Sequence, residues 1–521
     1  MSSPALMTEG CFLPMVNLEP EAMQTGWRGR AAALSWDGRP LIGGTRREGT
    51  GAMAIWSPVH GGLLYEAALC SADMVDQAVV DAHRACERGV WSDLSPRARG
   101  MILLRLAELI VENHEELALR DTLEMGKPIA SALVDIRDLA PTLCRHYAEA
   151  ADKIYGDVAG SDAASLAFSL REPRGVVAAI APWNYPLPNA VIKVMPALAV
   201  GNCVVLKPSE LTPGSALRLG ELALEAGVPP GVLNVIPGDG VTTGAALARH
   251  PLVDMVTFTG STQAGRAIMA TASQSRIRPV ILECGGKSPQ IVFADAPASD
   301  LVAPRILGEA FANQGQLCVA RSRLLVHASR KADLMAALER EVRQYAVGDP
   351  LEPATTFGPL AGQRQCERVL GHIAGALRDG ARMVAGGPVD RPCGVAPTIL
   401  DDVSQGMAIV RDEVFGPVLT VQSFESTEEA IGLANGSSYG LAATVWTAHY
   451  PTAQTLVRRL KTGHVTVNGT VESYEGPGMS LAGEPRGDSG FGSETGLDSL
   501  RSYTAIKGVV LAGGPCRSAD R

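Results

Sequence analysis

The amino-acid sequence predicts an α/β protein with two doubly wound open-sheet domains and a small β arm. Short β-branched runs alternate with helical stretches from residue 175 to residue 293, and a second alternation runs from residue 322 to residue 461. Strands that alternate with helices form parallel sheets with right-handed crossovers. The chain has 521 residues, which is too long for a single hydrophobic core. Two or three domains are therefore expected.

The N-terminal part of the chain begins without a regular pattern and continues with helices. Residues 1–29 are assigned to an irregular N-terminal segment. Between residues 71 and 127, apolar residues such as Met74, Ala78 and Ala82 recur at helical spacing. These helices are expected to pack on the first of the two sheets.

Short runs rich in β-branched residues predict six buried strands, at residues 176–180, 204–206, 232–237, 255–259, 280–283 and 290–293. Helical stretches separate most of them, near residues 188–200, 213–227, 241–249 and 262–274. The first domain is therefore assigned to residues 30–150 and 173–284.

A second α/β series defines the other domain, assigned to residues 285–484. It has strands near residues 322–327 and 418–423 and helices near residues 330–346, 362–379 and 450–461.

Two extended pieces remain outside the two domains. Leu166, Phe168 and Leu170 alternate with other residues in the stretch 159–171, which predicts an exposed hairpin arm, and another extended piece lies near residues 503–510. The arm is assigned to residues 151–172 and 499–511. Exposed alternating strands need a partner edge, so a homodimer or homotetramer is expected.

Composition and charge exclude several classes of protein. The formal net charge of -9 argues against a nucleic-acid partner or an anionic membrane surface. The N-terminus lacks the pattern of a signal peptide, and prolines and Lys193 interrupt the longest apolar stretches, so no membrane span is expected. The ten cysteines include no CxxC pair, so neither a metal site nor a disulfide framework is predicted, and a reducing, cytoplasmic location is expected.

One cysteine differs from the others in its surroundings. Most cysteines are small buried hydrophobes, whereas Cys318 ends the polar turn NQGQLC at residues 313–318. A partly exposed thiol beside hydrogen-bond donors is expected to have a lowered pKa, and thiolates are strong nucleophiles. Cys318 is therefore a candidate nucleophile.

Two further residues could act with such a thiol. Glu283 opens the string ECGGKSP at a strand end, where a carboxylate can serve as a general base. Taken alone, a glutamate there is more often a structural contact. Asn184 lies in PWNYP at residues 182–186, where it is either an oxyanion donor or simply a turn former between two prolines.

Glycine-containing turns after predicted strands indicate a dinucleotide site. The turn GDGVTTG at residues 238–244 is one residue longer than the usual fingerprint, and a plain turn explains it equally well. FTGSTQAG at residues 258–265 is a better match, because a serine follows the glycine and can cap a helix. KPSE at residues 207–210 follows a strand at the ligand-binding edge of the sheet, although a solvated loop has the same composition.

These segments, together with EVFGPV at residues 413–418, resemble the aldehyde dehydrogenase superfamily across roughly residues 120–510. The resemblance implies an NAD-binding first domain and a catalytic second domain. It implies that Cys318 attacks an aldehyde to form a thiohemiacetal and then a thioester, that Asn184 and the Cys318 backbone N–H stabilise the oxyanion, and that Glu283 activates water for hydrolysis. One such oxyanion donor typically contributes about 10²–10³ in rate.

The resemblance also implies a set of cofactor residues: Pro182, Trp183, Lys207, Ser209, Glu210, Gly240, Gly244, Phe258, Gly260, Ser261, Gly265, Glu413 and Phe415. Within this set, Lys207 and Glu210 would bind the adenosine ribose, Glu413 would bind the nicotinamide ribose, and Phe415 would pack near the nicotinamide ring. A carboxylate beside the ribose 2′-hydroxyl repels a 2′-phosphate, so NAD is expected rather than NADP.

The substrate is expected to be a small aldehyde, and an aldehyde derived from an amine is the candidate. Residues 123–128 and 147–153 are most similar to the subgroup that acts on γ-glutamyl-γ-aminobutyraldehyde and related aldehydes. The family's aromatic tunnel loop is replaced here by a polar stretch that contains Glu472 and Glu475, with Glu484 nearby. These carboxylates would attract cationic aldehydes, unless they are solvated at a subunit interface.

Two other functions remain open at this point. A relative that transfers the acyl group to coenzyme A would share the nucleophile, but such relatives generally lack a base like Glu283. A catalytically silent binding or structural protein on the same scaffold would not need the set of Cys318, Glu283 and Asn184.

Overall fold

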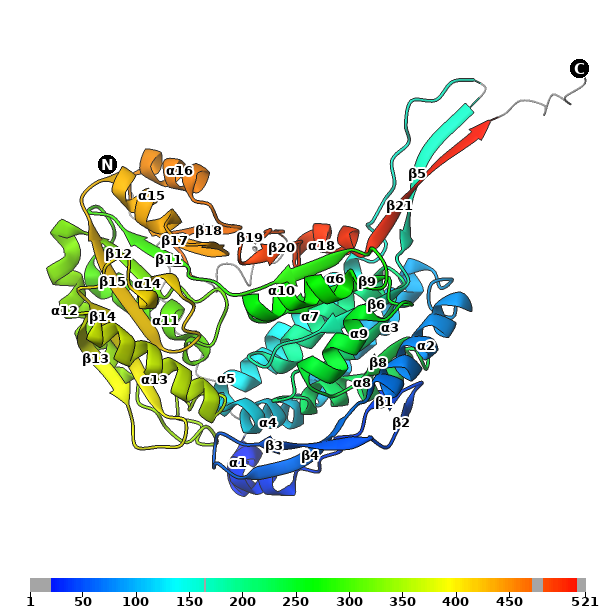
Figure 1. The fold of residues 1–521 in the computed structure, drawn as a ribbon, viewed down its shortest axis with the longest axis horizontal. Helices are drawn as coiled ribbons and strands as arrows, with labels where there is room; N and C mark the ends of the chain where they lie inside the picture. The colour runs from blue at the N-terminus through cyan, green and yellow to red at the C-terminus, as the bar shows by residue number, and fades with distance from the viewer. Residues whose placement is uncertain (1–19, 164, 471–480, 513–521) are drawn as a thin grey trace, which may run out of the picture.

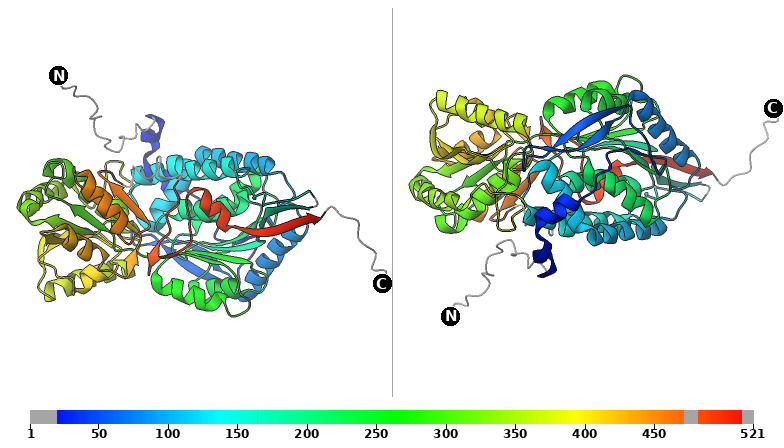
Figure 2. Two further views of the ribbon diagram at one scale, coloured as in Figure 1. Left: turned by 90° about the horizontal axis from the view of Figure 1, so that it is seen from above. Right: turned by 90° about the horizontal axis from the view of Figure 1, so that it is seen from below.

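The computed structural model describes residues 20–163, 165–470 and 481–512. Figure 1 shows two lobes, each built around one open sheet, and a two-stranded ribbon that projects away from one lobe. The two views of Figure 2 show the same arrangement from above and below, with the ribbon at the end of the molecule farthest from the second lobe.

The first lobe contains an eight-stranded sheet. Its five central strands are parallel, and nearly all of their residues are buried. Parallel strands covered on both faces carry such near-continuous apolar runs. In sheet order the strands are β2 (Thr45–Arg46), β1 (Leu41–Ile42), β8 (Leu233–Val235), β7 (Cys203–Lys207), β6 (Val176–Ile180), β9 (Met255–Thr259), β10 (Val280–Glu283) and β20 (Gly490–Phe491).

Helices cover both faces of this sheet, so the lobe is doubly wound as predicted. One face carries α2 (Ala72–Glu87), α9 (Ala245–Arg249) and α10 (Thr262–Ala272). The other carries α3 (Pro96–Glu112), α6 (Ala140–Ala150), α7 (Pro186–Ala199) and α8 (Gly214–Ala226), with α4 (His114–Met125) and α5 (Ile129–Val134) beside them. The hydrophobic core lies between these layers.

The second lobe contains a seven-stranded sheet that is parallel except for its first strand. In sheet order the strands are β13 (Arg382–Pro388), β14 (Val395–Asp401), β15 (Val418–Phe424), β12 (Arg323–His327), β11 (Pro289–Val292), β17 (Ala442–Trp446) and β18 (His464–Val467). Helices α11 (Ser299–Phe311) and α12 (Lys331–Glu341) pack on one face; α13 (Gln363–Arg378), α15 (Thr427–Asn435) and α16 (Tyr450–Arg459) pack on the other.

Shorter elements complete the described chain. Strands β3 (Gly51–Trp56) and β4 (Leu63–Leu69) form a hairpin, and β16 (Tyr439–Gly440) pairs with β19 (Arg486–Gly487). The remaining helices are α14 (Ala408–Arg411) and α18 (Gly496–Ser502). In the ranges that the structure describes, no helix has both the length and the apolar character needed to cross a membrane.

The projecting ribbon pairs two segments that are distant in the sequence. Strand β5 (Ser165–Pro173) is antiparallel to β21 (Thr504–Ala512) along its whole length. Backbone hydrogen bonds within residues 159–171, from the Ala159 N–H to the Ala167 carbonyl and in both directions between Asp162 and Ser165, agree with the predicted hairpin arm. The longer ladder with the C-terminal strand satisfies more backbone groups than a local turn does.

The N-terminal segment contains a helix that the sequence pattern did not predict. Helix α1 (Pro20–Ala33) includes the end of the expected irregular stretch 1–29, and residues 1–19 lie outside the described residues. Gly26 adopts a φ of 59° and kinks the helix, which breaks the helical period. Trp27 is buried in the first core and holds this segment to the lobe.

Candidate active site

The first sheet has a topological switch point between β6 and β9. From β6 the chain winds outward through β7 and β8, and it then returns to form β9 and β10 on the other side of β6. Open α/β sheets bind ligands outside the carboxyl ends of the strands at such a point. The segments 182–186, 207–210 and 260–265 follow β6, β7 and β9, so three predicted motifs meet at this edge.

Lys207 ends β7, and its side chain is buried at this edge. Its ammonium donates to the Pro208 carbonyl at 3.0 Å and lies 3.6 Å from the Glu210 carboxylate. Burial lowers the pKa of Lys207. A Cβ added to Gly244 would lie 3.6 Å from the lysine side chain, so the turn before α9 packs on the lysine stem.

The turn from β9 into α10 requires two glycines. An added Cβ on Gly260 would lie 2.5 Å from the Phe258 ring, and one on Gly265 would lie 2.6 Å from the Cys284 sulfur. Ser261 caps α10 by accepting a hydrogen bond from the first helical turn at 3.3 Å. The helix N-terminus, whose N–H groups favour an anion, therefore lies at the same edge.

Two predicted residues of the second lobe reach this edge. The rings of Trp183 and Phe415 meet edge to face, with their centroids 5.3 Å apart. Glu413 accepts a hydrogen bond from the Gly286 N–H at 2.9 Å, and burial raises the pKa of this carboxyl. Phe415 has a φ of 55°, which is rare for a large side chain and is typical of a functional loop.

The remaining cofactor candidates have local roles in their turns. The Ser209 hydroxyl accepts a hydrogen bond from the Leu211 N–H at 3.2 Å. Gly240 opens a short π-helical turn capped by Asp239, whose carboxylate accepts from the Thr242 N–H at 2.5 Å.

The loop that carries Cys318 has a strained backbone. Asn313 and Gln314 both lie in the left-handed region, with φ values of 50° and 57°. Each such residue costs on the order of 1–3 kcal/mol, so the surroundings must hold it. The Asn313 amide does so by donating to the carbonyls of Asn184 at 2.8 Å and Gln316 at 3.1 Å.

The buried side chain of Asn184 is oriented at both ends. Its amide nitrogen donates to the Gln316 carbonyl at 3.0 Å, and its carbonyl oxygen accepts from the Asn189 amide at 3.2 Å. An asparagine amide carries two N–H donors, so a second N–H is available beside the one that binds Gln316. Asn189 fixes which end of the amide faces the cysteine loop.

The Cys318 thiol lies among carboxylates. The residue is half-buried, and burial, followed by the charges of Glu283 and Glu413, raises the pKa of its thiol to about 12. The expectation that the polar turn lowers this pKa is therefore wrong, because burial and, after it, the nearby carboxylates outweigh the backbone hydrogen bond that lowers the pKa. At neutral pH the thiol keeps its proton, so its attack requires a proton acceptor.

Glu283 ends β10 on the side of the sheet edge where the two lobes meet. Burial, followed by the charge of Glu494, raises the pKa of Glu283 well above its usual range, and Lys193 opposes this shift. An added Cβ on Gly286 would lie 2.4 Å from the Cys318 carbonyl, so this glycine allows the two loops to approach. Glu283 and Cys318 are thus close enough for their charges to interact.

A buried ion pair beside Glu283 was missed by the sequence analysis. The Lys193 ammonium on α7 contacts Glu494, and it lies 3.4 Å from the Thr257 hydroxyl. The Thr259 hydroxyl also donates to Glu494, at 3.4 Å. The signal in the sequence was a lysine within a largely apolar helix. It was interpreted only as a break in an apolar stretch.

The C-terminal segment reaches back to the same place. Ser489 donates to the Gly285 carbonyl at 2.7 Å and accepts from the Gly440 N–H at 3.1 Å. Its own carbonyl accepts from the Cys284 N–H at 2.8 Å. The polar loop that contains Glu472 and Glu475 lies outside the described residues.

The match to known proteins decides the family. The model of the aldehyde dehydrogenase family matches residues 45–509. The chain belongs to the aldehyde dehydrogenase family. This membership and the two sheets confirm the predicted fold class and the resemblance stated from the motifs.

Several members of the family are similar over nearly the whole chain. The NADP/NAD-dependent aldehyde dehydrogenase PuuC of Escherichia coli is 41% identical over 488 residues, which are 93% of this chain and 98% of PuuC. Indole-3-acetaldehyde dehydrogenase, solved in complex with NAD+, is 43% identical with a TM-score of 0.90 and covers 93% of this chain and 99% of its own. γ-Glutamyl-γ-aminobutyraldehyde dehydrogenase of Burkholderia cenocepacia is 42% identical with a TM-score of 0.91. The match covers 94% of this chain and 99% of that enzyme's chain.

Proposed function

We propose that this member of the aldehyde dehydrogenase family oxidises an aldehyde to a carboxylic acid with NAD as the oxidant. The observation that carries the proposal is the meeting of Cys318 and Glu283, from the two lobes, beside the switch point of the first sheet. Burial raises the pKa of both groups, and the charge of Glu283 raises the pKa of the Cys318 thiol further.

The residues at the switch point fit a dinucleotide. The α10 N-terminus suits the pyrophosphate, the buried Lys207 and Glu210 suit a ribose, and the Glu413 carboxylate suits the second ribose. The close packing at Gly260 and Gly265 supports this fit, because a side chain at either position would displace the turn. Bound NAD would supply the hydride acceptor that turns a thiohemiacetal into a thioester.

The Cys318 thiol is the proposed nucleophile. As its sulfur bonds to the aldehyde carbon, the thiol proton has to leave, and it can pass to solvent because Cys318 is only half-buried. The oxyanion would accept hydrogen bonds from the Asn184 amide and the Cys318 N–H. Asn189 keeps that amide oriented, so no reorganisation is needed when the charge develops.

The second half-reaction requires an activated water molecule. Glu283 would take a proton from water, the resulting hydroxide oxygen would bond to the thioester carbon, and the carbon–sulfur bond would break to release the acid. A base with a raised pKa suits this step, because it is strong enough to deprotonate water partially. Lys193 opposes the rise and so favours the ionised form of Glu283.

A carboxylate base separates this proposal from its closest alternative. An acyl transfer to coenzyme A would need no water activation, and a silent binding protein would need neither Glu283 nor Cys318.

For the cofactor, Glu210 lies beside Lys207 and is half exposed, so its charge disfavours a 2′-phosphate and supports NAD over NADP.

The substrate class, assembly and location are also proposed. An amine-derived aldehyde is supported by the similarity to γ-glutamyl-γ-aminobutyraldehyde dehydrogenase. A homodimer or homotetramer is supported by exposed apolar residues on the ribbon such as Ile506 and Val510. The cysteines of the described ranges are free thiols, which supports a cytoplasmic location.

The decisive experiment measures NADH formation with a panel of aldehydes and quantifies the product with and without coenzyme A. We expect reduction of NAD, a carboxylic acid as product, and no dependence on coenzyme A. The kcat/KM measured with NADP should be lower than the kcat/KM measured with NAD. An acyl-coenzyme A product would contradict the hydrolytic step, and an absence of NADH with every aldehyde would contradict the proposal as a whole.

A further inference from the structure

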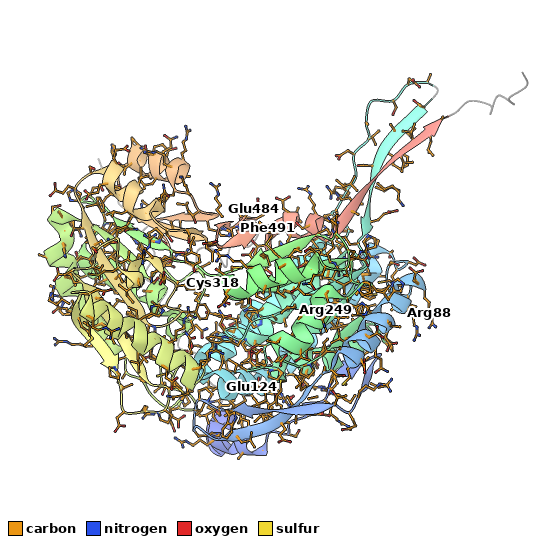
Figure 3. The ribbon with its side chains drawn as sticks, viewed as in Figure 1. Arg88, Glu124, Arg249, Cys318, Glu484 and Phe491 are labelled. Atoms are coloured by element: carbon orange, nitrogen blue, oxygen red, sulfur yellow. The ribbon has the colours of Figure 1, made fainter. Side chains whose placement is uncertain are left out.

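Glu484 lies on the segment that connects the two lobes. Its carboxylate accepts a hydrogen bond from the Gly492 N–H at 3.3 Å, just beyond β20. Figure 3 labels Glu484 next to Phe491 on this segment, above the position of Cys318 between the lobes. Strand β20 in turn pairs with β10, where Gly490 is opposite Glu283.

The backbone around Glu484 is held in place. An added Cβ on Gly463 would lie 2.5 Å from the Glu484 carbonyl, so this glycine lets the segment approach β18 closely. The Thr495 hydroxyl donates to the Leu481 carbonyl at 2.8 Å and ties the start of the segment to the residues after β20. The Glu484 carboxylate therefore has a defined position rather than one on a free loop.

Glu484 differs from the nearby Glu494 in its ion pairing. Glu494 is paired with Lys193, whereas in the described ranges no cation lies within ion-pair distance of Glu484, whose side chain is exposed. The Glu484 charge also contributes to the raised pKa of Glu283, which supports their proximity. An unpaired carboxylate therefore faces solvent beside the proposed base.

We propose that Glu484 is a specificity-determining residue that favours aldehydes carrying a positive charge and disfavours those carrying a carboxylate. An exposed charge acts over the distance of a small substrate and is screened by salt. Exposed pairs of this kind typically change binding by up to about fivefold. The inference rests on the proposed function, because the selection acts on the substrate of that site.

The first test compares three aldehydes of equal length, with an amino, a neutral or a carboxylate end. In the wild-type enzyme kcat/KM should be highest for the aminoaldehyde and lowest for the aldehyde acid, and added salt should reduce the difference. Glu484→Gln keeps an acceptor for the Gly492 N–H but removes the charge, and it should reduce the preference by up to about fivefold. Glu484→Asp, which keeps the charge, should retain most of the preference for the aminoaldehyde.

Asp498→Asn is the matched control, because it removes one exposed charge that is paired with Arg501 on α18. It should leave the preference unchanged. An equal loss of preference in Asp498→Asn and Glu484→Gln would overturn the proposal, because the net charge alone would then be responsible.

The second test uses the pH dependence of turnover with the neutral aldehyde. Glu494, Lys193 and Glu484 all act on Glu283, and removal of the Glu484 charge should lower the pKa of Glu283. The rise of turnover with pH should therefore move to lower pH in Glu484→Gln, and an unmoved profile would overturn the proposed placement. Wild-type turnover of all three aldehydes with equal efficiency would overturn the specificity role and leave the proposed function intact, whereas no turnover of any aldehyde would overturn both.

Discussion

At the scale of single residues, the site combines a protonated thiol with a carboxyl group of raised pKa. Each of these shifts begins with burial; the charges of Glu283 and Glu413 add to the shift of Cys318, and the charge of Glu494 adds to the shift of Glu283. A thiol whose pKa is about 12 is a weak nucleophile at neutral pH unless a base accepts its proton. The proposed chemistry therefore depends on the proton acceptor as much as on the sulfur.

Replacement of Cys318 by alanine should abolish NADH formation and leave NAD binding nearly unchanged. The reaction needs the sulfur for its covalent step, whereas the cofactor residues lie mainly on the first sheet. Steady-state assays with a calorimetric NAD titration measure the two effects. Activity above a few per cent of wild type would remove Cys318 from the role of nucleophile.

Replacement of Glu283 by glutamine should give a first burst of NADH and then stop. The charge of Glu283 contributes to the raised pKa of the Cys318 thiol, so its removal lowers that pKa and favours the thiolate. Hydrolysis of the thioester loses its base at the same time. Rapid mixing should show a burst close to one NADH per active site; a missing burst would mean that Glu283 is needed to activate the thiol.

Replacement of Lys193 by methionine should shift the pH dependence of turnover to higher pH. Lys193 lowers the pKa of Glu283, so its loss raises that pKa further, and more alkaline conditions are needed to ionise the base. Lys153→Met, which removes an exposed lysine paired with Asp152, is the control. If both variants keep the wild-type profile, the ion pair of Lys193 with Glu494 has only a structural role.

At the scale of elements, a buried ion pair braces the loop after Cys318. Arg321 donates to the Val319 carbonyl at 2.8 Å, and its guanidinium lies 3.8 Å from the carboxylate of Glu309 on α11. The Thr444 hydroxyl on β17 donates to the same carboxylate at 2.9 Å. Both charged residues are almost fully buried, so the pair links a helix, a strand and the cysteine loop.

Arg321→Met alone should destabilise the protein by about 3–5 kcal/mol, because it removes a buried positive charge that lies beside the Glu309 carboxylate. The double variant Arg321→Met with Glu309→Met should recover most of this loss, since apolar groups of similar volume need no counter-charge. Chemical denaturation measures the free energy of unfolding of the single and the double variant. Equal stabilities of the single and double variants would show that the two charges are not coupled.

At the scale of the whole molecule, the ribbon of β5 and β21 extends beyond the lobe from which it arises (Figure 1). Its exposed apolar residues include Ile506 and Val510, which are 65% and 69% exposed. Exposed apolar strands with free edges favour pairing with another chain. The ribbon is thus the surface through which we expect copies of the chain to assemble.

Ile506→Asp should shift the protein toward smaller assemblies, because it places a charge on this surface. Leu377→Asp, at a position on α13 that is 40% exposed, is the matched control away from the ribbon. Light scattering coupled to gel filtration measures the mass of each. An unchanged mass for Ile506→Asp would mean that assembly, if present, uses another surface.

Much of the fold was predictable because its signals are local. The parallel strands of the first lobe, such as Met255–Thr259 and Val280–Glu283, were predicted with the same bounds, since buried strands read as continuous apolar runs. Strands β13, β14, β17 and β18 were not predicted; two glycines weaken the signal of β13 and a proline that of β14, whereas the Val and Thr residues of β17 and β18 are a strand signal that was overlooked.

The motifs by themselves determined the family, the fold class and the candidate residues Cys318, Glu283 and Asn184. Tertiary structure alone decided the electrostatics around them. The raised pKa of Cys318, the ion pair of Lys193 with Glu494 and the pairing of β5 with β21 all arise between residues that are far apart in the chain. A local pattern carries propensity and chemistry, but burial and the sum of nearby charges exist only once the chain has folded.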